Sequence, residues 1–351
     1  MSTATHTKQP TIVDIAVRLN LSISTVSRAL RNAPDVNTHT KQAVLEMAEK
    51  IGYEPNTVAA SLRNNKTNII GIIVPEFVHV YFPSVILGVQ DVVNKAGYKL
   101  MICQSSESFD LEEKNLQALV SSRVDGLIMA LSRETDHYKH IKKVQEKTPI
   151  VFFNRITDQI SGSKVLVDDY GGAYEAVRHL IEVGCRRIAH ISGPKNLTMC
   201  ESRLQGYLDA LNHYQIPINE NYILHADFVD DKARECTQQL IAMDDKPDAI
   251  FAVNDPTAIE ALICIKQNGL NIPDDIALVG FSNAPHSAFV DPPLTSVVQP
   301  TFQIGQVAAK LLLEHIEKGE DHHPEIRILE TSLIIRESTK KTLSKLTDIS
   351  Y

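Results

Sequence analysis

The chain has 351 residues, of which 43% are hydrophobic and 22% are charged, and its formal net charge is −8. This length exceeds that of one ordinary domain and fits a small module joined to a core of about 280 residues. The lack of an apolar stretch of about 18 residues argues against a membrane protein. The N-terminus lacks the layout of a secretory signal, so we expect a cytoplasmic protein. The five scattered cysteines predict buried free thiols, with neither a disulfide framework nor a metal site.

Charge is distributed unevenly along the chain. Residues 1–66 carry eight Lys and Arg against five Asp and Glu, a balance of +3 that leaves −11 for the remainder. A weakly basic head on an acidic body can approach phosphates head-first while the body is repelled. The asymmetry therefore favours DNA as a partner of the N-terminal part.

Residues 11–51 show the periodicity and capping signals of three short helices. The first is predicted over residues 12–19, with Thr11 as N-cap and Asp14 completing a capping box. Asn20 tolerates the left-handed conformation of a tight helix end, and Ser22 can cap a second helix over residues 23–31. A third helix over residues 38–51 would close a three-helix core.

The outer face of the second helix suits a reader of the DNA major groove. Val26 and Leu30 point inward in this register, which leaves polar side chains and Ile23 outside. Arg28 can grip guanine with two hydrogen bonds, and Ile23 can contact a thymine methyl group. A helical bundle that contacts other proteins is the alternative that this pattern leaves open. Residues 56–63 are helix-compatible but too short to be stable alone, which predicts a hinge that orders on a partner.

From residue 68 onward, apolar strand-like runs alternate with amphipathic helical stretches, as in parallel sheets covered on both faces. The pattern restarts near SGSKVLVDDYGG, which predicts two doubly wound lobes. We expect crossings, the points where the chain passes from one lobe to the other, near Ser161, Asp291 and Pro324. We expect a helix-turn-helix headpiece (1–55), a hinge helix and linker (56–66), a core (67–340) and a tail (341–351). One lobe would hold 67–161 and 292–323, and the other 162–291 and 324–340. The tail lacks leucine heptads, so tetramers through a coiled coil are not expected.

Open α/β sheets bind ligands beyond the carboxyl ends of their strands, so polar residues after the apolar runs are candidates for a small-molecule site. Arg203 offers a forked donor for two hydroxyls or an anion, and Phe228 an apolar face for a ring. Asn254 and Asp255 can equally cap the following helix, and Phe228 can fill core. The candidates are Tyr81, Phe82, Asn154, Arg155, Arg203, Phe228, Asn254, Asp255, Ser282 and Gln299.

Two rival functions fit less well. An enzyme would need a catalytic set, but GFSNA at 280–284 lacks the last glycine of the G-x-S-x-G elbow and no G-x-G-x-x-G opens a βα unit. The pairs His137 with His140 and His322 with His323 have no carboxylate or Cys partner at supporting spacing. No enzyme, cofactor or metal is therefore expected. A solute-binding protein would share the core fold, but the headpiece and the missing signal argue against it.

The stretch TIVDIAVRLNLSISTVSRAL, followed by GYEPNTVAASLR and IIGIIVP, resembles the LacI/GalR repressor family. The resemblance continues through VDGLIMALS, GCRRIAHISGP, FAVND, IPDDIALVGF and PPLTSVVQP, and covers residues 11–338. It implies a periplasmic-binding-protein-like core and a homodimer on a pseudo-palindromic operator, with a small-molecule effector, a sugar or sugar derivative, controlling repression. The sign of the effector's action stays open. So does its charge, because Asn154 and Ser282 stand where the family carries aspartates, which leaves room for an anion.

For the headpiece, the resemblance implies base reading by Ile23, Ser24 and Arg28, and phosphate contacts by Ser22, Thr25, Ser27, Asn37 and Thr40. Residues 56–63 match a hinge helix that pairs with its dimer mate in the minor groove, where Leu62 would wedge between bases. The expected DNA-binding set is Thr11, Ser22, Ile23, Ser24, Thr25, Ser27, Arg28, Asn37, Thr40, Asn56, Ala59, Leu62 and Arg63.

Overall fold

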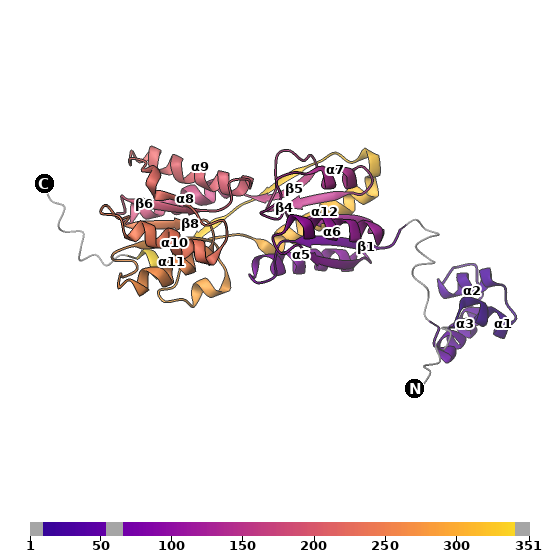
Figure 1. The fold of residues 1–351 in the computed structure, drawn as a ribbon. Helices are drawn as coiled ribbons and strands as arrows, with labels where there is room; N and C mark the ends of the chain where they lie inside the picture. The colour runs from indigo at the N-terminus through magenta and orange to yellow at the C-terminus, as the bar shows by residue number, and fades with distance from the viewer. Residues whose placement is uncertain (1–9, 54–65, 341–351) are drawn as a thin grey trace, which may run out of the picture. The chain divides into compact units, whose positions relative to one another are not determined.

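The computed structural model describes residues 10–53 and 66–340 and divides the chain at Thr67 into two compact units. The N-terminal unit, the headpiece, contains α1 (Ile12–Leu19), α2 (Ile23–Leu30) and α3 (Thr38–Ile51). These bounds confirm the predicted helices to within one residue. The helices pack around a small hydrophobic cluster formed by Ile15, Ala16, Val26, Ala29, Val44 and Ala48. The C-terminal unit, the core, carries two six-stranded sheets (Figure 1).

The first lobe is built on the sheet with strand order β11-β5-β4-β3-β1-β2, whose recorded pairs are all parallel. Its strands are β1 (Ile69–Val74), β2 (Lys99–Gln104), β3 (Gly126–Met129), β4 (Ile150–Phe153), β5 (Ser163–Val167) and β11 (Ile326–Leu329). One face packs against α5 (Tyr81–Lys95) and α12 (Thr301–Lys318), and the other against α6 (Phe109–Ser121) and α7 (Lys139–Gln145).

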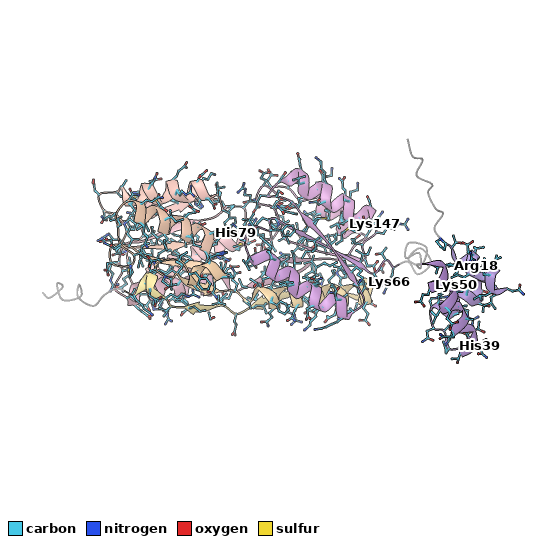
Figure 2. All side chains as sticks on the ribbon, turned by 90° about the horizontal axis from the view of Figure 1, so that it is seen from below. Arg18, His39, Lys50, Lys66, His79 and Lys147 are labelled. Carbon is cyan, nitrogen blue, oxygen red and sulfur yellow. The ribbon has the colours of Figure 1, made fainter. Side chains whose placement is uncertain are left out.

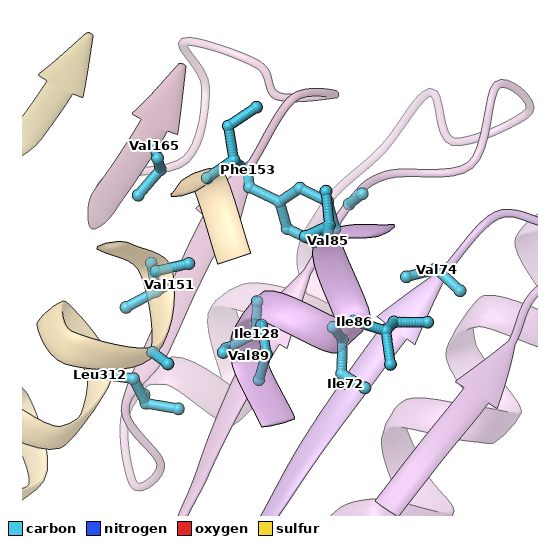
Figure 3. Packing of buried hydrophobic residues seen from close by; sticks show 14 of the residues in the cluster. Ile72, Val74, Val85, Ile86, Val89, Ile128, Val151, Phe153, Val165 and Leu312 are labelled. Atoms are coloured by element: carbon cyan, nitrogen blue, oxygen red, sulfur yellow. The ribbon is translucent and has the colours of Figure 1, made fainter. Parts of the chain in front are cut away.

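Figure 3 shows the first of these layers, where Val85 and Val89 of α5 meet Ile72, Ile128 and Val151 of the sheet. The two helices of this layer cross closely. A Cβ on Gly88 of α5 would lie 2.0 Å from the carbonyl oxygen of Phe302 on α12, so only glycine fits there.

The second lobe repeats the plan with strand order β12-β10-β9-β8-β6-β7, in which only the β10–β12 pair is antiparallel among the recorded pairs. Its strands are β6 (Ile188–Ser192), β7 (Ile223–His225), β8 (Ala249–Ala252), β9 (Ala277–Ser282), β10 (Thr295–Val298) and β12 (Ser332–Ile334). The covering helices are α8 (Asp169–Glu182), α9 (Thr198–His213), α10 (Asp230–Ile241) and α11 (Asp255–Gln267).

The two-lobed fold is confirmed, but the three crossings lie later than the sequence suggested. Strand β5 pairs with β4 and β11, so residues 163–167 belong to the first lobe. Likewise β10 pairs with β9 in the second lobe, and β11 pairs with β5 in the first. The crossings therefore follow Val167, Val298 and Leu329, and not Ser161, Asp291 and Pro324. The physical reason is that an apolar run records burial but not which sheet buries it.

In the part of the chain that the structure describes, no helix has the length and apolar character needed to cross a bilayer. Cys185, Cys200 and Cys264 are buried free thiols as expected, whereas Cys103 and Cys236 are only half-buried. The hinge positions Asn56, Ala59, Leu62 and Arg63 and the tail 341–351 lie outside the described residues.

Candidate functional site

Three residues expected to contact DNA are the N-caps of the three headpiece helices. Thr11 forms a capping box with Asp14, in which the Thr11 backbone N–H donates to the Asp14 carboxylate at 2.7 Å. Ser22 Oγ accepts from the Thr25 N–H at 3.1 Å, and Asn37 Oδ1 accepts from the His39 N–H at 2.8 Å. Helix N-termini favour phosphate groups, so caps at these positions suit a phosphate contact as well as a helix start.

The outer face of α2 presents the side chains expected to read bases. Val26 is fully buried beneath this face, whereas Ile23 is 50% exposed on it. Ser24 is exposed, and its Oγ lies 2.8 Å from Ser22 Oγ. Arg28 is exposed and ion-paired with Asp35, which precedes α3. An exposed isoleucine among short hydroxyls and a guanidinium fits a groove-reading surface.

The other predicted phosphate-binding residues are also placed on the headpiece surface. Ser27 accepts from Arg31 through its backbone oxygen at 3.0 Å and its Oγ at 3.3 Å. Thr25 and Thr40 are half-buried on α2 and α3. Figure 2 labels three further groups at the headpiece surface, Arg18, His39 and Lys50, all of which are exposed.

A cavity of about 850 Å³ lies between the two lobes of the core. Residues from both lobes line it, among them His79, labelled in Figure 2. Nine of the ten side chains predicted from the strand ends are part of the lining: Tyr81, Phe82, Asn154, Arg155, Arg203, Phe228, Asn254, Ser282 and Gln299.

Asp255, the tenth predicted residue, does not line the cavity. Its buried carboxylate accepts hydrogen bonds from Ala284 N at 2.6 Å, Ser287 Oγ at 2.5 Å and Ser296 Oγ at 2.6 Å. Burial raises the pKa of Asp255, and these hydrogen bonds oppose the rise. Asp255 therefore holds the loop after β9, while its neighbour in sequence, Asn254, faces the cavity. Asn254 does both tasks, since it lines the cavity and caps α11.

Arg203 is fully buried at the cavity wall and is held on three sides. Its Nε donates to Asp169 Oδ1 at 2.8 Å, its Nη1 donates to the backbone oxygen of Val253 at 2.5 Å, and its guanidinium lies 3.6 Å from the Phe281 ring centroid. Burial raises the pKa of Asp169, and Arg203 opposes this rise. The positive charge of Arg203 is thus compensated inside the protein.

Arg155 joins the two lobes at another wall of the cavity. Its Nη1 lies 2.7 Å from both carboxylate oxygens of Glu107. The guanidinium also lies 5.4 Å from the ring centroid of Phe82 in the first lobe and 4.8 Å from that of Phe228 in the second. Cation–π contacts and the ion pair fix Arg155 in place and orient Phe228 toward the first lobe.

The remaining lining residues offer neutral polar groups. Gln299 Nε2 donates to Ser282 Oγ at 3.0 Å, which leaves Gln299 Oε1 buried without a partner among the described residues. The Tyr81 hydroxyl is also buried, and a hydrogen bond with the Asn154 side chain acts to lower its pKa. Burial, reinforced by Asp169, raises the pKa of Tyr81 well above its usual value, so the hydroxyl stays protonated.

The cavity lining also contains polar residues that the sequence analysis did not name, among them Glu107, Arg133 and Thr301. Glu107 follows β2 and Arg133 follows β3. The strand-end rule that found the other nine, applied to every strand and to several residues after it, would also have identified these two.

The pairs and motifs considered for catalysis have other contacts. His140 Nε2 lies 3.0 Å from Glu112 Oε1 inside the first lobe, so a carboxylate does reach it, from a distant part of the sequence. His137 packs on Phe109, and His322 Nε2 lies 3.0 Å from Ser163 Oγ. Within residues 10–53 and 66–340, no group of three or more His, Cys, Asp or Glu side chains is arranged to hold a metal.

Comparison with known proteins agrees with this architecture. Residues 11–56 match the bacterial regulatory proteins of the lacI family, and residues 177–339 match a periplasmic binding protein-like domain. The HTH-type transcriptional repressor CytR of Escherichia coli K12 is 32% identical over 330 residues, which are 94% of this chain and 96% of that protein. The ribose operon repressor of Halalkalibacterium halodurans is 34% identical over 332 residues, 94% of this chain and 97% of that protein.

The chain belongs to the lacI family of bacterial regulatory proteins. It is a DNA-binding transcriptional regulator, and its relatives are repressors and not enzymes. A structure of the transcriptional regulator CelR with cellobiose, 30% identical, covers 94% of this chain and 100% of that chain with a TM-score of 0.72. The Lac repressor dimer bound to operator, 24% identical, shares the fold with a TM-score of 0.84 over 95% of this chain and 99% of that chain.

Proposed function

We propose that this family member represses transcription as a cytoplasmic homodimer on a pseudo-palindromic operator, and that a small polar effector in the interlobe cavity controls its affinity for DNA. The observation that carries the proposal is the outer face of α2, where Ile23, Ser24 and Arg28 are exposed and do not take part in the hydrophobic core. Side chains of these kinds on an exposed second helix match the chemistry of base edges in the major groove.

A symmetric dimer follows from the way such helices read DNA. Two identical headpieces related by a two-fold axis require two half-sites related by the same symmetry. The Lac repressor of the same fold is a dimer on its operator, which supports this arrangement. The hinge residues Asn56, Ala59, Leu62 and Arg63 would then contact the minor groove, with Leu62 as the wedge.

The two-lobed core supplies the means of control. Its cavity is lined by both lobes, and three chain segments cross between them, so a ligand that contacts both lobes favours one interlobe angle over another. A change in this angle would alter the separation of the hinges in a dimer and thereby couple the ligand to operator binding. The lining residues named from the sequence, apart from Asp255, are the proposed effector contacts. Structures of CelR with cellobiose and of an Enterococcus faecium relative with ribose support a sugar or sugar derivative as the class.

The experiment is selection of bound sites from a random duplex pool by the full-length protein. We expect a palindromic consensus with two half-sites and a flexible central step. The selection is run with and without a mixture of sugars and sugar phosphates, because the sign of the effector's action is open and DNA binding can require the effector. No consensus under either condition, in protein shown to be folded and dimeric, would overturn the proposal and indicate a protein-contact module.

A further inference from the structure

We propose that a second pocket, at α7 of the first lobe, binds a small anion that carries phosphate groups, and that this ligand acts on the contact between the two lobes. This α7 pocket is formed by residues 136–139, by Lys142, Lys143 and Glu146 of α7 and the residue after it, and by Gln159 in the loop after β4. It has a volume of about 480 Å³ and shares no lining residue with the interlobe cavity. The inference does not depend on the proposed function.

Three lysines line the α7 pocket without a partner of opposite charge. Lys139, Lys142 and Lys143 are exposed, and within residues 10–53 and 66–340 none of them forms an ion pair. The interlobe cavity differs, because Arg155 and Arg203 are each paired with a carboxylate. Residues 67–351 carry a net charge of −11, so three unpaired cations in one pocket are a local exception. An anionic ligand would neutralise them.

The spacing of the lysines indicates a ligand with more than one charge. Lys139 lies three residues before Lys142 and four before Lys143, so the three side chains share one side of α7. Like charges at these spacings repel one another and destabilise a helix. An anion with several oxygens relieves this repulsion, because it can contact more than one ammonium group at once. The arrangement therefore favours a multiply charged phosphate over a single carboxylate.

The rest of the lining limits the size of the ligand. Asp136 and Glu146 also face the α7 pocket, and neither forms an ion pair in the part of the chain that the structure describes. Their carboxylates can accept hydrogen bonds from hydroxyl or amino groups of a ligand, and the Gln159 amide can both donate and accept. The same carboxylates would repel an extended polyanion such as a nucleic acid. The α7 pocket therefore suits a small phosphate compound.

The loops beside the α7 pocket contact the second lobe. Asn196 Nδ2 donates to the backbone oxygens of Arg133 at 2.9 Å and Thr135 at 3.3 Å, in the loop that leads into α7. Thr198 Oγ1 donates to the backbone oxygen of Ile156 at 2.8 Å, in the loop after β4. Residues of the same two loops line the α7 pocket. A ligand that holds these loops together therefore supports their contacts with the second lobe.

The test measures binding of pyrophosphate and of ADP to the full-length protein by isothermal titration calorimetry. The double variant Lys142→Gln with Lys143→Gln should weaken both probes at least about tenfold, because it removes two of the three cations. The control, Lys246→Gln with Lys310→Gln, makes the same change in net charge at exposed positions outside the α7 pocket. It should keep both affinities within about twofold of the wild-type values.

The two probes separate the sources of the phosphate. Tighter binding of ADP would assign a nucleotide or a similar phosphate ester, and tighter binding of pyrophosphate would assign a free polyphosphate. No saturable binding of either probe, or equal losses in the lysine variant and its control, would overturn the site.

The Asn196→Ala variant tests the link to the second lobe, because Asn196 is exposed and lies outside the lining of the α7 pocket. The variant removes the hydrogen bonds to the loop before α7 and should weaken the probe at least about threefold. An affinity equal to that of the wild type would overturn the action of this ligand on the lobe contact.

Discussion

The headpiece and the cavity hold their functional side chains in opposite ways. On α2, Ile23 is half exposed and Arg28 is in an ion pair at the surface, where such pairs are worth little. In the cavity, Arg203 is fully buried and paired with a buried carboxylate. The headpiece can therefore lose a reading side chain and keep its fold. The core cannot lose a cavity guanidinium without leaving a buried charge unpaired, so ligand binding and stability are joined there.

The largest expected effect is that of Arg203→Met. The change removes the partner of Asp169 and should lower the free energy of unfolding of the core by about 3–5 kcal/mol, as measured by urea denaturation. Adding Asp169→Asn to this variant should recover part of the loss, because the buried charge is then removed. If the free energy of unfolding of Arg203→Met stays within about 1 kcal/mol of the wild-type value, the core does not need the ion pair. The contrast between the core and the headpiece would then not hold.

On the headpiece, Arg28→Ala should cost about 1–3 kcal/mol of binding to the selected operator and relax the preference at one base pair. Stability should change little, since the ion pair with Asp35 is at the surface. Lys41→Ala is the control and should change affinity slightly and equally on all sequences. Loss of affinity by Arg28→Ala that is uniform across operator variants would reject a base-reading role.

The core should also respond to pH through His190. This ring is fully buried between Phe251 and Tyr207, and burial lowers its pKa from 6.5 to about 4. The unfolded chain takes up a proton as the pH falls below 6.5, but the folded chain does not until about 4. The contribution of the neutral His190 ring to the free energy of unfolding is therefore fully present above pH 6.5. It declines toward pH 4, by about 2 kcal/mol between pH 7 and 5.

The measurement is the difference in unfolding free energy between the two pH values for wild type and His190→Phe. The variant should lose this part of the pH dependence, while His213→Phe, which removes an exposed ring, should keep it. Identical pH dependence of the His190 variant and the wild type would contradict a neutral buried ring.

The smallest effect is expected for Thr11→Ala, which removes the hydroxyl of the α1 capping box. Helix caps of this kind contribute about 1 kcal/mol. Amide hydrogen exchange in α1 should quicken accordingly, with Thr38→Ala, inside the first turn of α3, as the control. Unchanged protection of α1 would mean that packing of Ile15 and Ala16 alone fixes the helix start.

The same contrast explains what the sequence could predict. The helix ends in the headpiece follow from local caps at Thr11, Ser22 and Asn37, and a local signal is legible in one sequence. The cavity residues were found by position after strands, a rule that says where a residue lies but not which way it faces. It therefore included Asp255, which holds a loop, and omitted Glu107, which pairs with Arg155.

The lobe boundaries depend on strand pairing, which the local sequence does not encode. Val165 in β5 is as buried as any core strand residue, yet only the pairing with β4 and β11 assigns it to the first lobe. Pairing between strands that are distant in sequence produces no recognisable pattern in the sequence of either strand. The ion pairs that neutralise Arg155 and Arg203 have the same origin, because their carboxylates come from elements 48 and 34 residues away.

Thermodynamic linkage is the most direct test of coupling between the cavity and the headpiece. The operator affinity is measured with and without a sugar that is shown to bind in the cavity, and the affinity for that sugar is measured with and without operator. We expect both affinities to change by the same factor, at least about fivefold in one direction or the other. Operator affinity that is the same with and without the bound sugar would contradict the proposed coupling.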